Sequence, residues 1–182
     1  MGDCFCQDGI DPKPREDDPV TVHSLFEPPS DPDHLAGAVP VADLAALSPE
    51  RATAILMLRD WCGGGEGKRR VTAVFEETLG QGAPVAVEAF DALVRRLSTE
   101  GRRPMMRHGL GCRCVGSDEA VFANLLAIAA TGDMEDAMIV ASLLAPGAIL
   151  PLLVQDAQRA GFAIRTICRN LRASVPARPI LH

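Results

Sequence analysis

The chain has 182 residues, which is enough for one domain with its own hydrophobic core, so disulfides or metals are not needed for folding. Hydrophobic residues make up 47% and charged residues 23%, as in ordinary globular proteins, but aromatic residues reach only 4% and tyrosine is absent. The net charge of −6 disfavours nucleic acid as a partner, and no apolar run has the ~20 continuous residues of a membrane span. We therefore expect a soluble cytoplasmic protein without membrane contact. In that compartment its six cysteines indicate thiols or metal ligands rather than a disulfide framework.

Residues 1–40 are predicted to form an acidic, proline-rich, largely irregular arm. Its first 34 residues hold nine acidic residues against Lys13 and Arg15, a net charge of −7, and six prolines that prevent a helix. This start also lacks the positive flank and apolar stretch of a secretory signal. One apolar piece, VTVHSLFEP at residues 20–28, could dock on the body of the protein or on a partner.

Residues 41–175 are predicted to form a single helical domain, with a tail over 176–182. Ser48, Pro49 and Glu50 have the residue types of a helix start. Further helix starts are expected at Ser117 and Asp133. Helical spacing of apolar residues predicts ends at Gly63, Gly80, Gly101, Gly132, Pro146 and Gly161.

The segment 162–171, FAIRTICRNL, fits either a strand or a helix. We favour a helix because the chain contains no second strong strand that could pair with it. The predicted fold class is therefore all-α, a compact bundle of about six or seven short helices.

The glycine-rich stretch CGGGEGKRR, residues 62–70, does not fit a phosphate-binding loop. Cys62 stands where the first glycine is required, and Arg69 stands where a serine or threonine would bind magnesium. A helix, rather than a strand, is predicted to precede it. We interpret the stretch as a helix terminator followed by a solvated basic helix start.

The longest predicted connection contains RHGLGCRCVGSDE, residues 107–119. His108, Cys112 and Cys114 in it are candidate ligands for zinc or iron. Side chains two residues apart in an extended chain share a face, so both sulfurs can point to one side. The one-residue spacing is shorter than usual for zinc sites, and no fourth ligand lies nearby. The distant candidates for a fourth ligand are Cys62, His23, and the equally spaced pair Cys4 and Cys6.

Two other interpretations of this loop stay open. Neighbouring cations lower the pKa of a cysteine, so the pair could be a redox sensor in which one thiol is oxidised and the other resolves it. The same cations could instead bind an anion or nucleic acid. The candidate residues for that role are Arg102, Arg103, Arg107 and Arg113.

The function that we place first is a non-catalytic module that acts through another protein or through self-association. A metal-binding or thiol redox sensor centred on His108, Cys112 and Cys114 is the alternative. An anion-binding or nucleic-acid-binding regulator is the second alternative. Catalysis is disfavoured, because no acid that could orient a Cys112–His108 pair can be identified.

Overall fold

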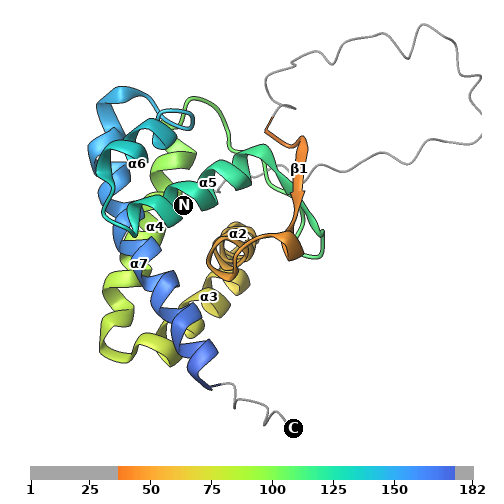
Figure 1. Ribbon diagram of the computed structural model, residues 1–182, viewed down its shortest axis with the longest axis vertical. Helices are drawn as coiled ribbons and strands as arrows, with labels where there is room; N and C mark the ends of the chain where they lie inside the picture. Colours follow the sequence, from red (N-terminus) through yellow and green to blue (C-terminus); the bar gives the residue numbers. More distant parts are fainter. Residues whose placement is uncertain (1–36, 175–182) are drawn as a thin grey trace, which may run out of the picture.

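The computed structural model describes residues 37–174, so the predictions for the rest of the arm and for the C-terminal tail lie outside the described residues. Figure 1 shows a group of helices with strand β1 at its edge. In chain order the elements are β1 Pro40–Asp43, η2 Leu44–Ala46, α2 Pro49–Cys62, α3 Gly65–Leu79, η3 Gly80–Gly82, α4 Ala83–Glu100, β2 Cys114–Gly116, α5 Ser117–Ala129, α6 Met134–Ala141, η4 Gly147–Ile149 and α7 Leu150–Ser174.

The mainly helical class is confirmed, and several helix ends lie where local signals predict them. Ser48 accepts a hydrogen bond from the Arg51 amide at 3.4 Å, and α2 then ends before Gly63. Asp133 accepts from the Asp136 amide at 3.1 Å and begins α6. Gly80 follows α3 with a φ of 54°, in the left-handed region that glycine enters without steric cost. These caps depend on neighbouring residues only, which is why the sequence predicts them.

A small antiparallel sheet corrects the prediction of an all-α fold without paired strands. Pro40 of β1 lies opposite Gly116 of β2, and Asp43 lies opposite Cys114. The two strands have four and three residues, which is too short for an alternating pattern to be recognised. Their pairing joins the start of the described chain to the loop that contains the cysteines.

The prediction of a helix end at Gly161 is wrong. Helix α7 has 25 residues and continues through Gly161 and the ambiguous segment 162–171, so the bundle differs slightly from the predicted number of helices. Gly161 lies against α5, where an added Cβ would collide with the Leu126 carbonyl and lie 3.2 Å from the Ala130 Cβ. Glycine is therefore present here for close helix packing and not as a stop.

The start of α5 also differs from the prediction. Gly116, rather than Ser117, is the N-cap, and its amide donates to Glu119 Oε2 at 2.9 Å. Ser117 is already the first helical residue, and its amide donates to the Val39 carbonyl at 3.1 Å. The acceptor for this amide therefore comes from the residue just before β1, far away in the sequence.

The core is centred on Phe90 of α4. Its ring contacts Trp61 of α2, Phe75 of α3 and Phe122 of α5, with centroid separations of 5.4, 6.0 and 6.3 Å. Helix α7 packs against α4 and α5 beside this cluster (Figure 1). The buried aromatic residues within residues 37–174 are thus gathered at one place, and the remaining core consists mainly of Ala, Leu, Ile and Val.

The glycine-rich stretch joins two helices, and a helix precedes it as predicted. Gly64 has a φ of 100°, and Gly67 packs so closely on the Asp60 carbonyl that a Cβ there would collide with it. Asp60 also pairs with Arg70, and this hydrogen bond raises the pKa of the Arg70 guanidinium. The basic start of α3 is therefore tied to the end of α2.

None of the helices within residues 37–174 is both long and apolar enough to cross a membrane.

Candidate metal and thiol site

His108, Cys112 and Cys114 come together in the loop between α4 and β2. One ligand atom from each residue lies within 4.8 Å of the other two. His108 Nδ1 is 3.9 Å from Cys112 Sγ and 3.8 Å from Cys114 Sγ, and the two sulfurs are joined as a disulfide. All three residues are half-buried.

The imidazole of His108 is oriented by the backbone on its other side. Its Nε2 lies 3.1 Å from the Ala38 carbonyl oxygen. Because a carbonyl can only accept, Nε2 carries the proton, and in the neutral ring Nδ1 presents its lone pair to the sulfurs. A backbone carbonyl on the far nitrogen is also the usual outer partner of a metal-binding histidine.

The loop is built around the guanidinium of Arg59, which α2 carries beneath it. Arg59 Nη1 donates to the Cys112 carbonyl at 2.6 Å and to the Gly109 carbonyl at 3.3 Å, and Nη2 donates to the Cys114 carbonyl at 2.6 Å. Since the carbonyls of residues 112 and 114 both point to Arg59, the two residues have the same orientation and their side chains share one face. This arrangement brings the two sulfurs together.

Two carboxylates at the start of α5 complete the support. Glu119 accepts from Arg59 Nε at 2.6 Å and from the His108 amide at 3.1 Å, and neither charged side chain of that pair is exposed. Asp118 accepts two bonds from Arg103, both at 2.7 Å, and one from the Met106 amide at 2.8 Å. The loop is therefore held by charge-assisted hydrogen bonds on both sides of His108.

The residues before β1 cross this loop in close contact. The Gly37 carbonyl accepts from the Asp118 amide at 3.1 Å, and a Cβ on Gly37 would collide with the Asp118 carboxylate. On the other side, a Cβ on Gly116 would lie 2.9 Å from the Gly37 carbonyl and 3.3 Å from the His108 ring. Glycine at these two positions lets the chain pass close enough for Ala38 to reach His108.

The structure does not add Cys62 to the group. Cys62 lies half-buried at the end of α2, and Cys168 is a buried cysteine whose sulfur lies 3.5 Å from Thr53 Oγ1. The other proposed fourth ligands, Cys4, Cys6 and His23, lie outside the described residues. Within residues 37–174 the group therefore has three members.

The four arginines that we proposed for anion binding each have a different partner. Arg103 pairs with Asp118, and Arg102 Nε donates to the Ser142 carbonyl at 2.9 Å. The other two engage the ends of the loop. Arg107 is buried and donates to the Cys62 carbonyl at 3.3 Å, and exposed Arg113 lies 3.4 Å from Asp43. Anion binding by this set stays a prediction.

Sequence reasoning missed the role of Arg59 and treated Glu119 only as an acidic residue in a first helical turn. A signal was present in AILMLRDWC, where Arg59 interrupts an apolar run at the position one helical turn after Ile55. A charged residue on the core-facing side of a helix requires a buried partner. The identity of that partner, 60 residues further along the chain, could not be read from spacing.

Comparisons with models of known protein families, with curated proteins and with solved structures find no match to this chain. The chemistry of the site is therefore derived from its own geometry.

Proposed function

We propose that the chain is a metal-binding regulatory protein whose site is formed by His108 Nδ1 and the thiolates of Cys112 and Cys114. The observation that carries this proposal is the convergence of the three ligand atoms within 4.8 Å. Tetrahedral zinc has bond lengths of ~2.0–2.3 Å, so its ligand atoms lie about 3.5–3.8 Å apart. The two nitrogen–sulfur distances, 3.8 and 3.9 Å, are close to this separation.

The site binds metal in its reduced form. Thiolates are the ligands, so the Cys112–Cys114 bond must first take up two electrons, after which the sulfurs separate to the spacing of two zinc ligands. One imidazole and two thiolates favour Zn²⁺ among the common divalent ions. A fourth position is left for water, for a partner's side chain or for a ligand outside the described residues, and this open position suits regulation.

We expect the full-length protein, reduced with a thiol-free phosphine, to bind one Zn²⁺ per chain. Replacing His108 by Gln, or Cys112 or Cys114 by Ser, should weaken binding by more than the ~10–100-fold loss that follows removal of an outer partner of a metal ligand. The measurement is competition against a chromophoric chelator. Cobalt(II) absorption provides a second readout because it reports thiolate ligation directly.

Cys62→Ser is the matched control, since Cys62 is also half-buried and lies outside the group. It should retain the wild-type affinity, whereas equal losses in all the variants would contradict the site. The double variant Cys4→Ser/Cys6→Ser tests the predicted fourth ligands separately. Failure of the reduced wild-type protein to bind either metal would overturn the proposal.

A thiol redox sensor is the second candidate, and the disulfide between Cys112 and Cys114 favours it. A hydroperoxide would oxidise one thiolate to a sulfenic acid and leave as an alcohol or water. The second thiol would then attack that sulfur, forming the S–S bond and releasing water. The unprotonated Nδ1 of His108 faces both sulfurs and can accept the proton of either thiol.

We expect dilute hydroperoxide to convert the reduced pair to the disulfide before it oxidises Cys62 or Cys168. The intact chain should lose the mass of two hydrogens, and peptide mapping should place the bond between Cys112 and Cys114. His108→Gln should slow the reaction at neutral pH, because the thiols lose their proton acceptor. Oxidation of Cys62 at the same rate as the pair, or an unchanged rate in His108→Gln, would contradict this mechanism.

The protein-interaction function that we placed first from the sequence stays a proposal. It is compatible with the site, because a metal or a disulfide that fixes residues 108–114 would also fix the surface that this loop offers to a partner.

A further inference from the structure

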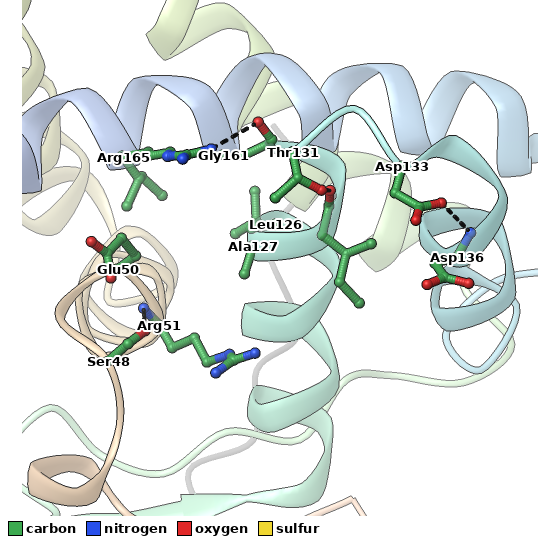
Figure 2. Close-up of a pocket in the computed structure, with 13 residues that line it drawn as sticks. Ser48, Glu50, Arg51, Leu126, Ala127, Thr131, Asp133, Asp136, Gly161 and Arg165 are labelled. Atoms are coloured by element: carbon green, nitrogen blue, oxygen red, sulfur yellow. Dashed lines mark hydrogen bonds between the residues drawn. The ribbon is translucent and has the colours of Figure 1, made fainter.

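A pocket of about 450 Å³ lies between the start of α2, the end of α5, the start of α6 and the middle of α7 (Figure 2). None of the residues of the cysteine loop lines it. Its wall combines an apolar floor with charged side chains, including two arginines from different helices. The pocket is therefore a second place, independent of the thiols, at which a small molecule could bind.

Arg51 is the unexplained member of this wall. Its Nε is buried and has no hydrogen-bond partner within residues 37–174, and its guanidinium makes no ion pair there. Figure 2 shows the side chain extending from α2 toward α5. A buried donor without an acceptor destabilises a fold by about 1–3 kcal/mol, so an acceptor bound in this pocket would be stabilised at Arg51.

Arg165 of α7 is the second cation of the pocket. In the described chain its guanidinium has one contact, from Nη1 to the Ala130 carbonyl at 3.5 Å, which is at the outer limit of a hydrogen bond. Like Arg51 it has no carboxylate partner among residues 37–174. Two guanidinium groups from different helices thus line one pocket with most of their donors available.

The carboxylates of the pocket have structural roles already. Glu50 lies 3.4 Å from Arg172, and Asp133 accepts the Asp136 amide as the cap of α6. Asp136 stands in the first turn of α6, where a negative charge stabilises the helix dipole. Figure 2 places Asp133 and Asp136 at the opposite end of the pocket from Arg165 and Glu50. Figure 2 shows Arg51 and Arg165 on facing walls of the pocket, so a single oxyanion would be held by one of them. Arg51, whose Nε has no partner in the described chain, is the one that suits a negatively charged group.

We propose that this pocket binds a small organic anion, with its carboxylate or phosphate held by Arg51. The guanidinium fork matches either oxyanion with two parallel hydrogen bonds. Leu126, Ile128 and Ile164 provide the apolar surface for a short hydrocarbon body. The volume falls within the range of ~300–1,000 Å³ that small-molecule sites occupy.

The probes are hexanoate, hexyl phosphate and hexanol, which share a hydrocarbon chain and differ in the head group. Titration of the full-length protein is followed by NMR at the arginine Nε–H signals and by thermal unfolding. Hexanoate or hexyl phosphate should shift the Arg51 signal and raise the unfolding temperature, and the stronger of the two identifies the preferred oxyanion. Hexanol should do neither at the same millimolar concentration.

Arg51→Gln should weaken anion binding by roughly tenfold or more, the loss expected when a charge-assisted hydrogen-bond pair is removed, whereas Arg165→Gln should weaken it less. Arg51→Gln should not lower the unfolding temperature of the ligand-free protein, because the lost Nε–H has no partner in the described chain. Arg69→Gln, which changes an exposed side chain of α3, is the control and should bind the anions as the wild type does. The proposal is overturned if neither anion binds, if hexanol binds equally well, or if Arg51→Gln keeps the wild-type affinity.

Discussion

Arg59→Met is expected to lower the free energy of unfolding by about 3–5 kcal/mol, the usual cost of removing one partner from a buried ion pair. Neither Arg59 nor Glu119 has any exposed side-chain surface, so the carboxylate would be left buried without its counter-charge. Three loop carbonyls would lose their donor at the same time. Equilibrium unfolding in urea measures the change, and zinc affinity should fall with it because the loop that positions both sulfurs is loosened.

Arg69→Met is the matched control for this prediction. Arg69 is largely exposed and pairs with Glu66 on the surface of α3, so its loss should change the free energy of unfolding by less than about 0.5 kcal/mol. Arg59→Lys should recover little stability, since an ammonium cannot supply the planar set of donors that reaches Glu119 and the loop together. A loss below about 1 kcal/mol in Arg59→Met would show that Arg59 does not hold the loop.

Phe90→Ala should lower the free energy of unfolding by a similar amount, about 3–5 kcal/mol, because the phenyl ring is completely buried among three other aromatic rings. Its removal leaves a cavity where α2, α3 and α5 meet. Since α5 carries Asp118 and Glu119 at its start, loosening the contact with Phe122 should also make the cysteine loop less ordered. Urea unfolding measures the first effect, and hydrogen exchange of the amides of residues 106–116 measures the second.

Phe162→Ala removes the same ring from a position on α7 that is 60% exposed. We expect its free energy of unfolding to stay within about 0.5 kcal/mol of the wild-type value. If Phe162→Ala were as damaging as Phe90→Ala, the cluster around Phe90 would not be the centre of the core.

The features that the sequence predicts correctly depend on short-range rules. Ser48, Gly80 and Asp133 act on their own helix ends, so their effect can be recognised without knowing what packs nearby. The proximity of Cys112 and Cys114 follows in the same way from their spacing in an extended chain. His108 adds a third group because the Gly109–Cys112 turn, closed by a 3.0 Å hydrogen bond, folds the loop back.

The features that could not be predicted depend on partners far away in the sequence. Gly161 has the residue type of a helix stop, but its close approach to Leu126 makes it a packing glycine within α7. Strand β1 exists because β2 pairs with it, and neither segment is long enough to show a strand pattern alone. The partnership of Arg59 with Glu119 likewise requires knowledge that α2 and α5 pack together.

The hydrogen bond from His108 to Ala38 has a consequence for biosynthesis. Residues that complete the cysteine site come from positions 38, 59 and 108–119, so the site cannot close until a ribosome has released the chain beyond Glu119. The N-terminal segment must wait while α2, α3 and α4 form, and contacts of such long sequence separation form slowly. During that interval both thiols are exposed to the surrounding redox buffer and metal pool, which can act on the nascent protein before its fold is complete.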